Sequence, residues 1–238
     1  MKIVNILKQS LIEYPGKISG VIFIAGCNFR CPFCYTPHLV LPERIKKIPS
    51  IPEKKVLSFL EQRRGFLEAV AISGGEPTLN PELPDFFKKI KEMGYDIELE
   101  TNGSNPTMLK YLIEKKLIDY VCMDIKNDLV FEKYNPLVGG VLTREIFERV
   151  KKSIEILLEG KVDYQFRTTL MKEFHKKEDI INICKKIKKA KVYYLQNFEN
   201  TKGETVSGKT FTPFSEEEIK EIVEEGKKYT NIKARSYL

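Results

Sequence analysis

Short apolar runs alternate along this chain with longer amphipathic stretches. The short runs are rich in β-branched residues and have the length of buried strands, whereas the longer stretches repeat apolar residues at helical spacing. Such alternation is typical of repeated β-α units. The predicted strands are 20–25, 69–73, 96–100, 120–124, 162–168 and 192–197, with a further strand at 3–8.

Helix boundaries are marked by residues that favour helix ends. Pro52 opens the first predicted helix, and Ser215 with Glu218 has the spacing of a capping box, which predicts a last helix ending near Gly226. The other predicted helices are 53–64, 82–93, 108–116, 144–158 and 178–190.

One domain is expected, because 238 residues suffice for one substantial core and no internal repeat is visible. It would span 1–238, with its core at about 18–200 and a C-terminal helical extension at about 214–238. Parallel strands with helical crossovers form either an open doubly wound sheet or a curved, barrel-like one, and ligands bind beyond the carboxyl ends of the strands in both. Two longer loops, 127–143 and 201–213, are either irregular surface or segments that order on a partner.

The composition is that of a globular protein, with 42% hydrophobic and 31% charged residues. Lys8, Gln9 and Glu13 interrupt the N-terminal stretch, which therefore lacks the apolar core of a signal peptide or membrane span. We expect a cytoplasmic protein with no membrane partner. The net charge of +7 would suit nucleic acid, but the lysines lie mostly on predicted helix faces, so a solvated surface is expected instead.

Three of the five cysteines lie within eight residues, which argues against a disulfide framework. Cys27, Cys31 and Cys34 follow the first core strand with C-x3-C-x2-C spacing, and thiolates are ligands for iron and zinc. A 4Fe-4S cluster held by three cysteines has one iron open to a small molecule, whereas electron-transfer clusters are typically closed by four. The alternative is zinc held by these cysteines and His38, although structural zinc sites usually draw ligands as two separated pairs.

The cysteine motif, with the aromatic Phe33 before its last cysteine, resembles the signature of the radical S-adenosylmethionine (SAM) superfamily. The resemblance implies a partial (β/α)6 barrel of parallel strands, with one 4Fe-4S cluster and SAM as cofactors. It implies that Cys27, Cys31 and Cys34 are the metal-binding and catalytic residues, and that Phe33 lies near the adenine. The methionine moiety of SAM would chelate the open iron, and reduction would release a 5′-deoxyadenosyl radical.

Polar residues follow the later predicted strands, where a cofactor would lie. Gly74, Gly75 and Glu76 resemble the superfamily's Gly-Gly-Glu motif, and glycines let a backbone approach a ligand closely. The full set of expected cofactor-binding residues is Phe33, Gly74, Gly75, Glu76, Glu100, Thr101, Asn102, Asp124, Lys126, Arg167 and Gln196.

The third and fourth strand ends resemble those of glycyl-radical activases. The resemblance implies that Lys126 pairs with the methionine carboxylate, and that Glu100, Thr101 and Asp124 surround it with room for a monovalent cation; activases commonly have aspartate where this chain has Glu100. Other interpretations stay open. Asp124 and Lys126 form a local ion pair in one, Arg167 neutralises a buried acid in another, and Gln196 caps the sheet edge in a third.

Residues 11–17 and 21–34 resemble the activating proteins of anaerobic ribonucleoside-triphosphate reductase, and the likeness covers about 5–200. It implies an anaerobic enzyme that makes a glycyl radical on that partner, with flavodoxin or ferredoxin as electron donor. Tyr35 departs from the histidine that members often have. The alternatives are activation of another glycyl-radical enzyme, radical chemistry on RNA or a small molecule, and a zinc-binding module without enzyme activity.

Overall fold

The computed structural model describes residues 1–200 and 203–235, and its strands form one sheet in the order β1 to β8. β1 pairs antiparallel with β2, and β2 to β8 pair in parallel. The strands are β1 (Ile3–Ser10), β2 (Ser19–Ile24), β3 (Ala69–Gly74), β4 (Asp96–Thr101), β5 (Tyr120–Asp124), β6 (Asp163–Leu170), β7 (Tyr193–Asn197) and β8 (Ile232–Arg235).

The predicted class, a partial barrel of parallel strands, is confirmed, and the structure adds one parallel strand to the six expected. The added strand, β8, lies where only a helical extension was predicted. Of its four residues only Ile232 is buried, so no apolar run marks it. The further strand predicted at 3–8 is β1, which is antiparallel because a short hairpin joins it to β2. Residues 236–238 of the predicted extension lie outside the described residues.

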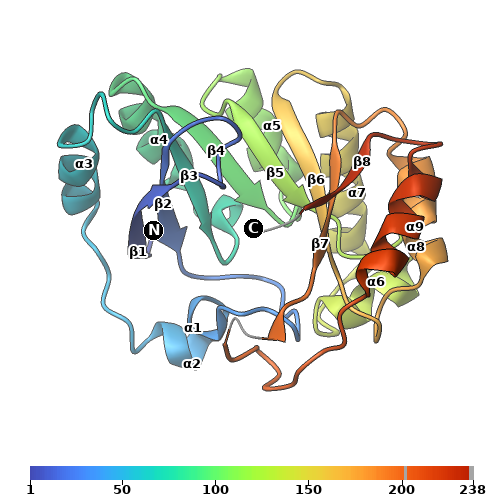
Figure 1. The fold of residues 1–238 in the computed structure, drawn as a ribbon. Helices are drawn as coiled ribbons and strands as arrows, with labels where there is room; N and C mark the ends of the chain where they lie inside the picture. The colour runs from blue at the N-terminus through green and yellow to red at the C-terminus, as the bar shows by residue number, and fades with distance from the viewer. Residues whose placement is uncertain (201–202, 236–238) are drawn as a thin grey trace.

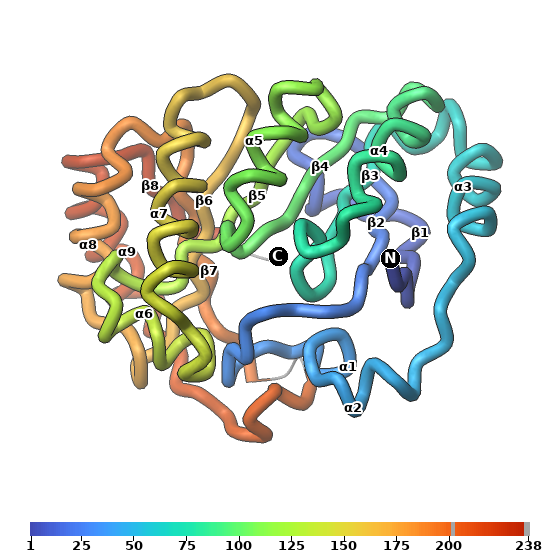
Figure 2. Tube along the Cα trace, turned by 180° about the vertical axis from the view of Figure 1, so that it is seen from behind, coloured from blue at the N-terminus to red at the C-terminus, as the bar shows by residue number. Residues whose placement is uncertain are grey.

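Helices α4, α5 and α7 cover the outer face of the curved sheet, behind the strands in Figure 1 and in front of them in Figure 2. The predicted capping box is present, since the Ser215 hydroxyl and the Glu218 carboxylate each accept from the other residue's backbone N–H. The longer helices are α3 (Glu53–Glu61), α4 (Leu83–Glu92), α5 (Pro106–Glu114), α7 (Arg144–Leu158), α8 (Lys177–Lys186) and α9 (Glu216–Gly226).

Three short helices lie in segments without a predicted element. α1 (Pro37–Val40) and α2 (Pro42–Ile45) follow the cysteine motif, and α6 (Phe131–Leu137) lies in the predicted loop 127–143. Tyr134 and Leu137 of α6 are buried. A helix of seven residues is too short to be stable alone, so tertiary burial stabilises it and the local sequence pattern does not reveal it.

The inner face of the sheet faces a cavity, and β1 and β8 form the two edges of the sheet. The Arg235 guanidinium donates to the backbone carbonyl of Ile12, which links β8 to the hairpin between β1 and β2. Within the described residues, no helix is long and apolar enough to cross a membrane.

Candidate functional site

A cavity of about 610 Å³ lies inside the curved sheet and reaches the carboxyl ends of its strands. This volume is in the range of small-molecule sites. Residues from every strand end that the sequence singled out meet there, because parallel strands present their carboxyl ends at one edge. The predicted residues that line it are Cys27, Cys31, Phe33, Cys34, Gly74, Gly75, Glu100, Thr101, Asn102, Asp124, Lys126, Arg167 and Gln196.

The three cysteines lie on the loop between β2 and α1. Cys31 is buried, whereas Cys27 and Cys34 are partly exposed to the cavity. The Phe29 amide donates to Cys27 Sγ at 3.4 Å, and the Cys34 thiol lies 3.2 Å from the Thr36 hydroxyl. Burial raises the pKa of Cys27 to about 11 and that of Cys31 to about 12, so both are neutral thiols until a metal displaces their protons.

The donor set fits an iron-sulfur cluster with one open iron. Three thiols line one cavity, and the two remaining cysteines lie elsewhere, Cys122 buried in β5 and Cys184 buried in α8. The zinc alternative needs His38 beside the three thiols. His38 is exposed on α1 and does not line the cavity that the three cysteines line.

Gly74 and Gly75 bring the β3 loop against the cysteine loop. A Cβ on Gly75 would lie 2.1 Å from the Gly26 carbonyl oxygen, and Gly74 has φ +128° with its own Cβ position 2.1 Å from the Ile24 oxygen. The Gly75 amide donates to the Ile24 carbonyl at 2.8 Å, and the Glu76 amide donates to Gly26 at 2.7 Å. The sequence predicted that the backbone of these glycines approaches a ligand closely. The structure shows that the glycines also let the backbone of the β3 loop approach the backbone of the cysteine loop.

Glu76 differs from its prediction, because it lies buried behind the cavity wall and does not line the cavity. Its Oε1 accepts hydrogen bonds from the Thr78 amide and hydroxyl and, at 2.7 Å, from the Thr101 hydroxyl. Its Oε2 accepts from the Asn102 amide at 2.6 Å. Burial raises the pKa of Glu76, and these hydrogen bonds oppose the rise. Because the bonds to Thr101 and Asn102 cross from one segment to the next, Glu76 connects the β3 loop to the end of β4.

Charged side chains of β4, β5 and β6 form one network on the cavity wall. Arg167 Nε donates to Asp124 Oδ1 at 2.8 Å, and its Nη1 lies 3.4 Å from Glu100 Oε1. Lys126 Nζ donates to Asp124 Oδ2 at 2.8 Å and lies 5.6 Å from the centre of the Phe33 ring. Burial raises the pKa of Asp124, but the charges of Arg167 and Lys126 outweigh it and hold that pKa well below its usual range.

These contacts bear on two open interpretations. The local ion pair between Asp124 and Lys126 is present, and both residues also line the cavity, so pairing and cofactor contact are compatible. A monovalent cation between Glu100 and Asp124 would share them with the Arg167 guanidinium, and such a site stays a prediction.

Several residues of the cavity wall were not among the residues predicted from the sequence. Ser73 lies two residues before the predicted Gly75, and Thr169 lies two residues after the predicted Arg167. Because alternate residues of a strand face the same side, this period would have identified both. Ser73 donates to Glu100 Oε2 at 2.6 Å. Glu13 reaches the cavity from the β1 to β2 hairpin, and Glu199 lies beyond β7. No sequence signal marks these two, because long-range folding alone brings them there.

Tyr35 joins the cysteine loop to the chain beyond β7. Its hydroxyl donates to the Glu199 carbonyl and accepts from the Glu199 amide at 2.9 Å, and its ring stacks on Phe198 with centroids 5.0 Å apart. Nearby, the Val206 amide donates to the Cys34 carbonyl at 2.9 Å. The described part of the predicted loop 201–213 is therefore ordered against this chain's own cysteine loop; residues 201–202 lie outside the described residues.

Comparisons with known proteins identify the family to which this chain is related. Residues 21–187 match the family described as the radical SAM superfamily. A protein of Methanocaldococcus jannaschii named as a glycyl-radical enzyme activating enzyme is 34% identical, with 94% of this chain and 91% of that protein covered. A 7-carboxy-7-deazaguanine synthase of Aquifex aeolicus is 29% identical, with 63% of this chain and 69% of that protein covered.

The crystal structure of Streptococcus suis SuiB has a similar fold. It matches with a TM-score of 0.68 at 19% identity, covering 91% of this chain and 49% of SuiB. At this identity the likeness shows the fold alone, and this chain corresponds to about half of that protein.

Proposed function

This chain belongs to the radical SAM superfamily, and we propose that it cleaves SAM reductively and installs a glycyl radical on a partner enzyme. The observation that carries the proposal is the cavity in which three thiols meet the polar strand ends, with no fourth cysteine among the described residues that line it. The relative named as a glycyl-radical enzyme activating enzyme supports the second half, because it matches over nearly the full length of both chains.

When bound, the 4Fe-4S cluster and SAM supply a 5′-deoxyadenosyl radical that abstracts hydrogen. Cys27, Cys31 and Cys34 would hold three irons and leave the fourth for SAM. Lys126 and Arg167 would meet the negative carboxylate of the methionine moiety, since both are cationic and line the cavity.

The other residues of the cavity wall would bind and orient SAM. The Phe33 ring would offer an apolar face to the adenine, and the backbone carbonyl groups at Gly74 and Gly75 would accept from the methionine ammonium. Thr101 would lie near the methionine carboxylate, and Asn102 and Gln196 would offer further polar contacts to SAM. Glu76 acts through its neighbours, because it holds Thr101 and Asn102 in place from behind the wall.

We propose anaerobic ribonucleoside-triphosphate reductase as the partner, and flavodoxin or ferredoxin as the electron donor. The sequence likeness of 11–17 and 21–34 to that reductase's activating proteins supports this choice. A single domain and a cytoplasmic location stay predictions. Activation of another glycyl-radical enzyme needs the same site and differs only in the partner.

The test is anaerobic reconstitution and reduction of the cluster, followed by SAM and the reductase of the same organism. 5′-Deoxyadenosine is assayed while the electron paramagnetic resonance spectrum is recorded. We expect 5′-deoxyadenosine and a glycyl-type doublet on the reductase. Cys31→Ala should abolish both, because a cluster ligand is lost, whereas Cys184→Ala, which removes a thiol far from the cavity, should retain both.

Other outcomes separate the two halves of the proposal. 5′-Deoxyadenosine without the doublet would overturn the choice of partner and leave SAM cleavage intact. A small-molecule substrate would then be the next candidate, because another relative is named as a 7-carboxy-7-deazaguanine synthase. An intact cluster that yields neither signal would overturn the whole proposal.

A further inference from the structure

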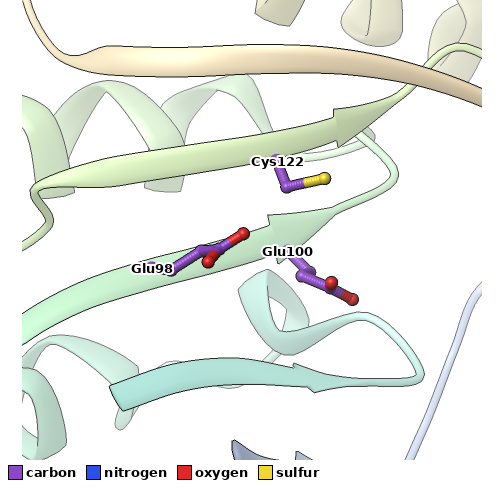
Figure 3. Close-up of side chains that lie close together, drawn as sticks. All are labelled: Glu98, Glu100 and Cys122. Atoms are coloured by element: carbon purple, nitrogen blue, oxygen red, sulfur yellow. The ribbon is translucent and has the colours of Figure 1, made fainter. Parts of the chain in front are cut away.

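Glu98 and Glu100 of β4 lie beside Cys122 of β5, inside the curved sheet (Figure 3). One ligand atom from each, a carboxylate oxygen or the thiol sulfur, lies within 4.8 Å of the others. Glu100 and Cys122 are direct neighbours in the register of the two strands. Glu100 lines the cavity, whereas Glu98 and Cys122 lie deeper, so the group lies next to the cavity and is reached through Glu100.

Glu98 has no partner for either carboxylate oxygen, although its side chain is only 1% exposed. A buried carboxylate without a hydrogen bond or counter-charge is strongly destabilising, so it must take up a proton or a cation. Burial and the neighbouring Glu100 and Glu13 raise the pKa of Glu98 well above its usual range, despite opposing charges from Arg167 and Arg235. The raised pKa favours a proton on Glu98 in the metal-free protein, and the observation that supports a ligand role is that its unpartnered oxygens lie beside Glu100 and Cys122.

The surrounding charges favour a cation. Arg167 is already committed to Asp124 and Glu100, and Lys126 to Asp124. Among the described residues, the carboxylates in or beside the inner cavity are Glu13, Glu76, Glu98, Glu100, Asp124 and Glu199. The cations whose charges act on Glu13, Glu98 and Asp124 are Lys126, Arg167 and Arg235. The carboxylates outnumber the cations, and a Cys122 thiolate would add to the excess negative charge.

We propose that Glu98, Glu100 and Cys122 bind one divalent transition-metal ion of the zinc class. The thiolate disfavours Mg²⁺ and Ca²⁺, which prefer oxygen ligands alone, and three protein ligands leave a fourth position toward the cavity. Gln165 Nε2 donates to Cys122 Sγ at 3.0 Å and orients the sulfur, as outer hydrogen bonds do at known metal sites. This site is separate from the three-cysteine motif, and it shares only Glu100 with the predicted monovalent-cation site at Glu100, Thr101 and Asp124.

The test measures zinc in the cluster-loaded protein, so that Cys27, Cys31 and Cys34 are already occupied. After chelator treatment and dialysis against Zn²⁺, elemental analysis should find one zinc per chain beyond the cluster iron. Glu98→Gln and Cys122→Ala should each weaken zinc binding at least tenfold. Cys184→Ala is the matched control, because it removes another buried thiol and should leave zinc binding unchanged.

Anomalous scattering at the zinc edge, from crystals of the cluster-loaded protein, should place the ion between β4 and β5. Zinc absent from the wild type, zinc located only at other residues, or unchanged affinity in Glu98→Gln would each overturn the proposal. If a variant does not fold, the position of zinc in the wild-type crystal decides. The readout does not depend on SAM cleavage, so failure of the proposed function would leave this result standing.

Discussion

Glu76, just after β3, and Glu98, within the neighbouring strand β4, are both buried glutamates, yet their surroundings are opposite. The Glu76 carboxylate accepts four hydrogen bonds from Thr78, Thr101 and Asn102, whereas neither oxygen of Glu98 has a partner. Protein donors compensate the first for its lost hydration, whereas no hydrogen-bond donor among the described residues compensates the second. The difference separates a carboxylate that holds loops together from one that is available to a ligand.

The largest effect is expected from a substitution that breaks the contact between the β3 loop and the cysteine loop, beside Glu76. In Gly75→Ala, the new Cβ would lie 2.1 Å from the Gly26 oxygen and 2.5 Å from its carbonyl carbon, both backbone atoms. We expect the free energy of unfolding to fall by about 3 kcal/mol or more, with loss of cluster iron, because the cysteine loop must move. Denaturant unfolding and iron analysis measure these effects.

Gly160→Ala is the control for Gly75→Ala. Gly160 has φ +73° but open space around its Cβ position, so only backbone strain of about 1 to 2 kcal/mol is expected, with cluster iron retained. Equal losses in the two variants would show that the contact between Gly75 and Gly26 is unimportant.

The second prediction compares the two glutamates directly in the metal-free protein. Glu76→Gln places an amide nitrogen, which cannot accept, among backbone and hydroxyl donors and should cost about 2 to 3 kcal/mol of unfolding free energy. Glu98→Gln loses no hydrogen bond and replaces a carboxyl group whose charged form is penalised by burial, so stability should be unchanged or higher. Denaturant unfolding in the presence of chelator tests both, and equal destabilisation would contradict the comparison.

A smaller effect is expected at the opposite anchor of the cysteine loop. Tyr35→Phe removes the hydroxyl that bonds to the Glu199 backbone and should cost about 1 kcal/mol. The cluster absorbance should also decay faster in air, because the loop loses its tie to the chain beyond β7. Tyr111→Phe is the control, since Tyr111 is 45% exposed, and it should change neither measurement. Unchanged air sensitivity in Tyr35→Phe would show that this tie does not protect the cluster.

The smallest effect on the free energy of unfolding is expected at His175, a buried side chain that, like Glu76, has hydrogen-bond partners. Burial lowers the pKa of His175 below 6.5, and its Nε2 lies 2.8 Å from the Lys126 carbonyl. The folded protein keeps the ring neutral while the unfolded chain protonates it, so stability is lost as pH falls through 6.5. We expect a loss of less than about 1 kcal/mol at pH 6.

Unfolding free energies of the wild type and His175→Gln at pH 8 and pH 6 test this. His175→Gln should show a smaller loss of unfolding free energy between pH 8 and pH 6 than the wild type. His38→Gln, at an exposed position, should show the same loss as the wild type. Identical pH profiles for the wild type and His175→Gln would contradict the assignment.

Much of the fold could be predicted because strands and helices have strong local periods. The strands β2 to β7 and the helix α7 lie within about two residues of their predicted bounds. The strand β8 and the helix α6 could not be predicted, because their burial comes from distant parts of the chain. The same limit holds for Glu13 and Tyr35, whose contacts with Glu100 and Glu199 join residues far apart in sequence.

The sequence by itself determined the chemistry, because three closely spaced cysteines and the polar residues after consecutive strands are local patterns. It could place Glu76 and Glu100 at strand ends, but not tell which side chain would face the cavity. Only the tertiary structure decided that Glu76 is enclosed by donors and that Glu98 meets Cys122 across two strands. The physical reason is that hydrogen bonding and desolvation of a buried charge depend on neighbours that only the folded chain brings together.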